Sequence, residues 1–218
     1  MARPQPRLGA VYAIADADSL GLAALPDAVA EIAAAGVETI QLRLKDGSPD
    51  ARLFAIVEAS VRRLEGASVS LWIDDRADLA ALFELPGAHL GQADLPPAAA
   101  RRVVGPTCRL GLSTHDDAQV MVADANPEVD MVAIGPVFPT QGKKDPEPVV
   151  GLAGVARARR TTGKPLVAIG GIDAETIASV LAAGADSAAV IGALGRSGVS
   201  PREIGQNCRR LLAAVAAG

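Results

Sequence analysis

Short segments with β-strand character recur along the chain with helical patterns between them, and this repetition restricts the fold more than any other feature of the sequence. Glycines precede many of these segments, where a left-handed residue can close a helix before the chain turns into a strand. Eight strand-helix units in 218 residues predict a single domain, residues 1–218, folded as a closed (β/α)8 TIM barrel rather than an open doubly wound sheet. The segments are Val11–Ala15, Thr39–Leu44, Val69–Asp74, Ala88–Leu90, Arg109–Ser113, Met131–Ile134, Leu166–Gly170 and Ser187–Ile191.

Between these segments, apolar residues recur at the spacing of one helix face. We expect three such faces to pack on the barrel. They comprise Leu53, Ile56, Val57, Val61 and Leu64, then Ala118, Met121, Val122 and Ala125, and finally Ile204, Cys208, Leu211, Leu212 and Val215.

Composition excludes several classes of protein. A net charge of −4 and only one tryptophan, one tyrosine and three phenylalanines argue against nucleic-acid binding. The apolar runs are strand-sized and the first six residues contain no apolar signal core, so we expect a cytoplasmic protein that does not bind membranes. Cys108 and Cys208 show no metal-binding spacing and are expected to be buried as small apolar side chains. The oligomeric state is not determined, which leaves a homo-oligomer open.

The second segment and its continuation, residues 40–46, carry unusual charge for a strand between two helices. Ile40, Leu42 and Leu44 alternate with three polar residues, so one side of the strand is apolar and the other polar. In an antiparallel sheet the polar side would simply face water. A parallel strand is covered on both faces, so an anionic ligand in the barrel opening would explain the polar set Gln41, Arg43 and Lys45.

Further polar residues follow the other strands, at the end of a (β/α)8 barrel where active sites lie. Asp74 and Asp75 follow the third segment and Asp94 follows the fourth. Their carboxylates suit a Mg²⁺ ion shared with substrate phosphates. Alternatively, Asp74 and Asp75 cap a helix that begins near Asp78, and Asp94 caps a helix that opens at Pro96.

The ends of the fifth, seventh and eighth segments offer other candidate groups. Gly170-Gly171 and Ile191-Gly192 could hold a phosphate on main-chain N–H groups, or could serve only tight turns. His115 could act as a general base, although its place at a helix start favours a supporting or capping role. We expect His89 to be structural and Trp72 to lie in the core.

Several ordered motifs together resemble the thiamine phosphate synthase family, from Tyr12 to about Leu194. These motifs are Gln41-Leu42-Arg43-Leu44-Lys45, His89-Leu90-Gly91-Gln92-Ala93-Asp94, Gly111-Leu112-Ser113-Thr114-His115, Gly135-Pro136-Val137-Phe138-Pro139-Thr140 with Lys143, and Ala168-Ile169-Gly170-Gly171-Ile172.

The resemblance implies a magnesium-dependent transferase of thiamine biosynthesis. Such an enzyme joins 4-amino-2-methyl-5-(diphosphooxymethyl)pyrimidine to 4-methyl-5-(2-phosphooxyethyl)thiazole and releases diphosphate. It also implies that Asp75 and Asp94 bind Mg²⁺. The residues implied for the pyrimidine diphosphate are Gln41, Leu42, Arg43, Leu44, Lys45, Asp74, Ser113 and Lys143, with Arg43, Lys45, Ser113 and Lys143 as catalytic groups. Those implied for the thiazole phosphate are Thr140, Gln141, Gly142, Gly171, Ile191 and Gly192.

The sequence departs from the family pattern at three positions. Asp74 stands where the family usually has asparagine, and an ionised carboxylate can only accept hydrogen bonds. Gly142 and Gly192 replace a threonine and a serine, which removes two hydroxyl donors from the implied thiazole-phosphate site. Main-chain N–H groups are the remaining donors there.

Two other functions are compatible with these motifs. One is a thiazole tautomerase, a relative with the same barrel, although Pro136 stands where that branch has a catalytic histidine. The other is a catalytically silent sensor of phosphate ligands, because one fold hosts many functions.

Overall fold

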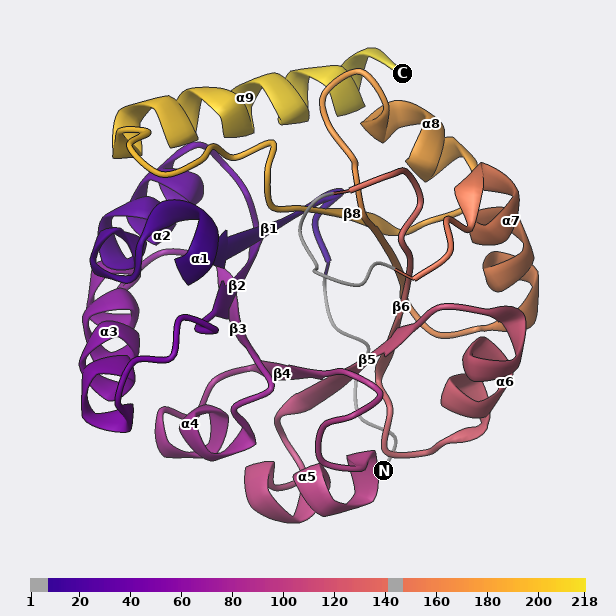
Figure 1. Cartoon of the computed structure of the whole chain (residues 1–218), viewed down its shortest axis with the longest axis horizontal. Coiled ribbons are helices and arrows are strands. Elements are labelled where there is room, and N and C mark those ends of the chain that lie inside the picture. Colours follow the sequence, from indigo (N-terminus) through magenta and orange to yellow (C-terminus); the bar gives the residue numbers. More distant parts are fainter. Residues whose placement is uncertain (1–7, 141–146) are drawn as a thin grey trace.

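A closed barrel of eight parallel strands forms the centre of the computed structural model, which describes residues 8–140 and 147–218 (Figure 1). Every predicted strand is present, and the ends differ from those expected by a single residue at most. The barrel prediction is therefore confirmed. The strands are β1 Val11–Asp16, β2 Thr39–Arg43, β3 Ser70–Asp74, β4 Gly87–Leu90, β5 Arg109–Thr114, β6 Met131–Ile134, β7 Leu166–Ile169 and β8 Ser187–Val190.

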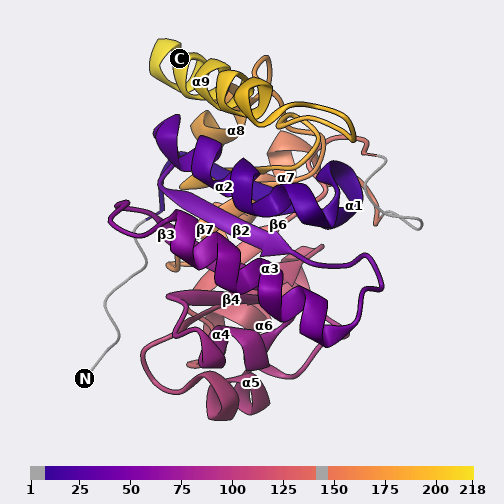
Figure 2. The ribbon, with the colours of Figure 1, turned by 90° about the vertical axis from the view of Figure 1, so that its left-hand side faces the viewer.

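Helices form a ring around the barrel (Figure 1), and α9 closes that ring by packing against both α2 and α8. Figure 2 shows α2 and α3 side by side over β2. None of the helices in the described residues is long and apolar enough to cross a membrane. The helices are α1 Ala17–Leu20, η1 Leu22–Ala24, α2 Leu25–Ala34, α3 Asp50–Arg63, α4 Ala77–Leu82, α5 Pro97–Val104, α6 Asp117–Ala125, α7 Gly151–Thr161, α8 Ile177–Ala182 and α9 Pro201–Ala217.

Strand alternation divides the apolar residues into two layers. Side chains that point outward, such as Ile40 and Leu42 of β2, join the large core between barrel and helices. A smaller cluster fills the barrel interior and includes Tyr12, Trp72 and Met131. Both cysteines are buried and reduced, as predicted, and burial raises the pKa of Cys108 to about 11 and that of Cys208 to about 12.

Trp72 packs inside the barrel, and its position explains why residue 87 is glycine. The indole is fully buried, donates from Nε1 to Ser70 Oγ at 2.9 Å, and meets Tyr12 edge-on with ring centroids 6.2 Å apart. A Cβ on Gly87 would lie 2.2 Å from Trp72 Cδ2. The neighbouring strand therefore accommodates the indole only without a side chain at this position.

The prediction for the buried face of α6 was wrong, although the helix itself is present. Met121 and Val122 are 62% and 68% exposed, whereas Val120 and Ala123 are buried. The Asp116 side chain caps the helix by accepting from Gln119 N. This start directs Val120 and Ala123, three residues apart, toward the barrel. The faces predicted for α3 and α9 do pack on the core.

Candidate functional site

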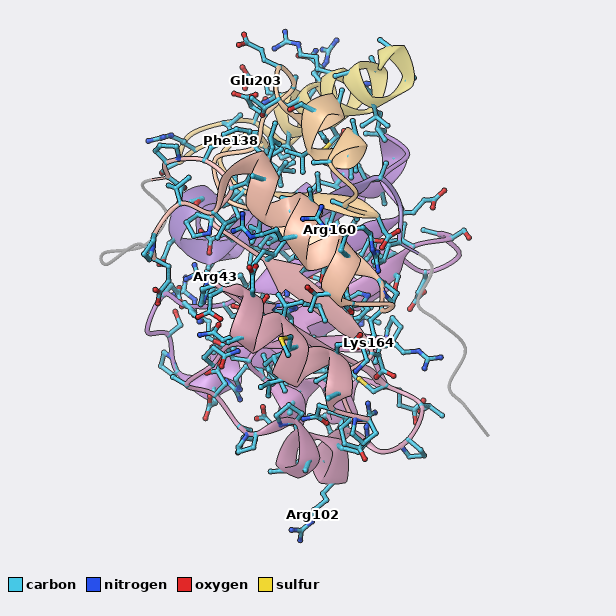
Figure 3. All side chains as sticks on the ribbon, turned by 90° about the vertical axis from the view of Figure 1, so that its right-hand side faces the viewer. Arg43, Arg102, Phe138, Arg160, Lys164 and Glu203 are labelled. Atoms are coloured by element: carbon cyan, nitrogen blue, oxygen red, sulfur yellow. The ribbon has the colours of Figure 1, made fainter. Side chains whose placement is uncertain are left out.

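A cavity opens at the carboxyl ends of the strands, here called the mouth of the barrel. Figure 3 shows Arg43 at this end and Lys164 at the opposite end. Tyr12, Ile14, Met131, Val167, Ile169 and Ile191 form an apolar part of its lining. The predicted site residues that line the cavity are Gln41, Arg43, Lys45, Asp74, Asp75, Ser113, Thr140 and Ile191. Residues from separate strands are thus brought together.

A chain of alternating charges runs along one wall of the mouth, from β1 through β2 to β3. Arg43 Nη1 lies 2.6 Å from Asp16 Oδ1, and Arg43 Nε lies 3.6 Å from Asp74 Oδ2. Lys45 Nζ lies 3.6 Å from the same Asp74 oxygen and 2.6 Å from Asp75 Oδ2. Asp74, the departure from the family asparagine, therefore bridges two cations.

These contacts keep both cations of the wall protonated. Burial lowers the pKa of Arg43, but its hydrogen bond to Asp16 and the nearby carboxylates raise the pKa above the ordinary value overall. Burial also lowers the pKa of Lys45. The hydrogen bond to Asp75 and the charge of Asp74 outweigh burial, so the pKa of Lys45 is raised overall. At Asp74 burial raises the pKa despite the two neighbouring cations.

Asp75 and Asp94 lie at the ends of β3 and β4, where each carboxyl group influences the pKa of the other. Asp75 has a left-handed φ of 60°, rare for a residue with a side chain, and its N–H donates to His89 O at 2.8 Å. Asp94 Oδ2 accepts from Gly91 N at 2.6 Å. A Cβ on Gly91 would lie 2.8 Å from that same oxygen, so the glycine makes room for the carboxylate.

The capping alternative for these carboxylates was wrong. No side chain caps α4 or α5, whose N-cap residues are Arg76 and Pro96. Two facing carboxylates that cap no helix are a suitable oxygen donor set for Mg²⁺. Among the described residues, no group of three or more His, Cys, Asp or Glu is placed to hold a metal.

Asp75 should make the stability of the metal-free protein depend on pH. Burial, the Asp74 charge and the contact with Asp94 raise the pKa of Asp75 from 3.8 to about 6. Because the folded protein holds this proton more tightly than the unfolded chain does, protonated Asp75 stabilises the fold below about pH 4. This stabilisation is lost as the pH rises through about 6. We expect the Tm of the metal-free protein to fall across this window relative to that of Asp75→Asn, measured side by side by calorimetry. A constant difference in Tm between the two would contradict the shift.

His89 has a second position-dependent feature besides the structural role predicted for it. Its Nε2 lies 2.8 Å from Ser113 Oγ, which supports the predicted structural role, but the ring also lines the cavity. Alternation along β4 could have revealed this, because His89 lies two residues before Gly91 and points to the same side. His115 lies with Nδ1 2.8 Å from Gly135 O, as expected for a supporting residue, and it also lines the cavity.

Two buried polar atoms lie in the cavity wall, one on Gln41, which was a predicted site residue, and one on Tyr12, which was missed. Tyr12 and Gln41 are 2% and 3% exposed, yet Tyr12 Oη and Gln41 Nε2 have no hydrogen-bond partner in the described structure. Burial and the charge of Asp74 raise the pKa of Tyr12 well above its ordinary value, so its hydroxyl stays protonated and able to donate. Buried polar groups normally have partners. A ligand in this cavity could supply them.

Removing the Tyr12 hydroxyl should therefore have opposite effects on stability and on ligand binding. We expect Tyr12→Phe to raise the free energy of unfolding of the ligand-free protein by about 1 kcal/mol, because an unsatisfied buried group is lost. The same variant should bind its substrate about fivefold more weakly, which corresponds to one lost hydrogen bond. Thermal melts and substrate titrations measure the two effects. A lower Tm would show that the hydroxyl is already satisfied without ligand.

Other predicted site residues, including Asp94, lie outside the cavity lining. The Leu42 and Leu44 side chains are buried in the outer core, so only their main chain could contact a ligand. Gly171 has a φ of 67°, and a Cβ there would lie 2.7 Å from Pro139 O. Gly192 has open space around it, so neither backbone nor packing requires glycine. Gln141, Gly142 and Lys143 lie outside the described residues.

Comparison with known proteins identifies the family. The family model described as thiamine monophosphate synthase matches residues 11–194, which include every element from β1 to β8. The chain belongs to this family. The match ends at Leu194, where the resemblance of the motifs also ended.

Similar proteins agree with this assignment. A thiamine-phosphate synthase of Koribacter versatilis is 47% identical over 189 residues, which cover 85% of this chain and 88% of the relative. One from Leptospira biflexa is 36% identical and covers 91% of this chain and 95% of its own. The solved structure of thiamine phosphate pyrophosphorylase from Pyrococcus furiosus superposes with a TM-score of 0.81 at 26% identity, covering 95% of both chains.

Proposed function

We propose that this protein is a thiamine phosphate synthase. It couples 4-amino-2-methyl-5-(diphosphooxymethyl)pyrimidine with 4-methyl-5-(2-phosphooxyethyl)thiazole to give thiamine phosphate and diphosphate. The observation that carries the proposal is the mouth of the barrel, where Arg43 and Lys45 lie within one cavity with Asp74 and Asp75. A metal-bound diphosphate needs both signs of protein charge, and the relatives are named for this reaction.

Asp75 and Asp94 would hold Mg²⁺, since their facing carboxylates offer oxygen donors. When bound, Mg²⁺ neutralises negative charge on the diphosphate oxygens. Arg43, Lys45 and Ser113 line the same cavity and would bind the diphosphate from the protein side. Lys143 belongs to this proposed set and lies outside the described residues.

The protein's contribution to the reaction is to bind, orient and exclude water. The C–O bond to diphosphate breaks with its electron pair leaving on the phosphate oxygen, and the thiazole nitrogen forms the new C–N bond. Arg43 and Lys45 stabilise the charge that develops on the leaving group. Asp74 accepts from the pyrimidine amino group, and Gln41 Nε2, which has no described partner, donates to the pyrimidine ring. The reaction needs no protein nucleophile.

The thiazole phosphate would bind at the ends of β6, β7 and β8. Thr140 and Ile191 line the cavity there. Main-chain N–H groups near Gly171 and Gly192 would compensate for the hydroxyl groups missing from the family pattern. Gln141 and Gly142 complete the proposed set. A cytoplasmic location and any homo-oligomer also remain predictions.

The proposal is tested by mixing purified protein, Mg²⁺ and both substrates and measuring thiamine phosphate and diphosphate. Formation of both products, abolished by EDTA and restored by Mg²⁺, is the expected result. Tight substrate binding without turnover would instead indicate a sensor. Conversion of a thiazole tautomer alone would indicate the tautomerase, which we disfavour because Pro136 lines the cavity where that branch has histidine.

A further inference from the structure

Arg43 is held in place by the end of a neighbouring strand. Its Nη1 donates to Asp16 Oδ1 at 2.6 Å, and the Arg43 side chain is only 19% exposed. Asp18 Oδ2 approaches the same nitrogen at 3.6 Å but belongs to an exposed side chain. Within the described residues, the other terminal nitrogen, Nη2, has no hydrogen-bond partner. The guanidinium is thus hydrogen-bonded through Nη1, lies 3.6 Å from Asp74 Oδ2 through Nε, and retains Nη2 for a ligand.

Asp16 is itself rigidly placed, because both of its oxygens are engaged. The carboxylate is the N-cap of α1, where Oδ2 accepts from Ser19 N at 3.1 Å and from Ser19 Oγ at 2.6 Å. The residue is 3% exposed. Its other oxygen meets Arg43, which is 27 positions later in the chain. The carboxylate therefore ties the end of β1 to the end of β2.

We propose that Asp16 is a positioning residue that orients the Arg43 guanidinium toward a diphosphate group in the cavity. This inference rests on the proposed function. An arginine side chain has many rotamers, and its planar fork binds phosphate oxygens well only when it is correctly oriented. Asp16 selects one orientation before the ligand arrives, which lowers the entropic cost of binding.

The direction in which diphosphate affinity changes when Asp16 is replaced distinguishes a positioning role from a purely electrostatic one. A carboxylate close to an anion site repels the anion, so removing its charge alone should tighten diphosphate binding. Loss of positioning should weaken binding instead. Asp18 provides the matched control, because it carries the same charge near the same nitrogen without the short hydrogen bond.

The experiment measures binding of inorganic pyrophosphate to the full chain in the presence of Mg²⁺ by titration calorimetry. We expect Asp16→Asn to weaken binding about tenfold, whereas Asp18→Asn should leave it unchanged or slightly tighter. In an Arg43→Ala background, Asp16→Asn should have no further effect, because its action passes through the guanidinium. Thermal melts verify that each variant is folded, and Asp16→Glu, which keeps the charge but displaces it, should give an intermediate loss.

Binding by Asp16→Asn that equals or exceeds that of Asp18→Asn would overturn the inference and leave the proposed function intact. The same holds if the Asp16→Asn loss persists in the Arg43→Ala background. If the unaltered protein fails to bind pyrophosphate with Mg²⁺, this inference fails, and the turnover assay decides the proposed function separately. If Asp16→Asn does not fold, wild-type affinity in Asp16→Glu overturns the inference and a weakened affinity supports it.

Discussion

Replacing Asp94 with alanine should abolish turnover. The variant would lose one of the two carboxylates proposed to hold Mg²⁺, and with it the charge neutralisation of the departing diphosphate. We expect kcat/KM to fall at least ~1,000-fold, equivalent to ~4 kcal/mol of transition-state stabilisation. Steady-state kinetics over a range of Mg²⁺ concentrations measure the loss.

Two further variants separate this chemical effect from a structural one. Asp94→Asn keeps an oxygen that can accept from Gly91 N but removes the charge. It should therefore lose activity almost as completely as the alanine variant while retaining nearly wild-type stability. Asp46→Ala removes an exposed carboxylate that bonds only locally to Ser48, and it should retain activity. Wild-type activity and Mg²⁺ dependence in Asp94→Ala would refute the metal assignment.

Gly87→Ala should strongly destabilise the fold. The added methyl group would lie 2.2–2.4 Å from three atoms of the Trp72 indole. The ring cannot easily yield, because it is fully buried, bonded to Ser70 and packed against Tyr12. Overpacking of this kind typically costs about 3 kcal/mol, which corresponds to a fall in Tm of roughly 6–12 °C for a domain of this size.

Gly163→Ala is the matched control, because an added Cβ there has no atom within 4 Å and the residue does not need a positive φ. Its free energy of unfolding should change by less than about 0.5 kcal/mol. Calorimetry on both variants gives the comparison. A Gly87→Ala protein that melts with the wild type would show that the strand or the indole moves without cost.

Local apolar patterns in the sequence were sufficient to predict the barrel architecture. Each strand needs only a short apolar run, and each helix only an apolar period of about 3.6 residues, so eight repeats were visible directly. In a parallel barrel all carboxyl ends of the strands meet at one end. The clustering of Arg43, Lys45 and Asp75 in one cavity could therefore be predicted without coordinates, and the cavity lining confirms it.

Contacts between segments that are distant in the chain could not be predicted from these local sequence patterns. Alternation along β2 puts Leu42 on the opposite side from Arg43, but only the packed barrel shows that Leu42 lies in the outer core and Arg43 in the cavity. Apolar residues occupy four consecutive positions of α6, Val120 to Ala123, and the face predicted from them, with Met121 and Val122, was the wrong one. Asp75 and Asp94 matched a helix-capping pattern equally well until their facing arrangement was seen.

The amino-acid sequence by itself determined the strand and helix repeat, the end of the barrel that carries the charges, and the family. Those properties depend on residues close together in the chain. Only the tertiary structure decided that Asp16 holds Arg43, that Tyr12 presents a hydroxyl with no described partner to the cavity, and that Gly87 must accommodate Trp72. The physical reason is that these contacts depend on strand register and barrel closure, which bring together side chains that lie far apart in sequence.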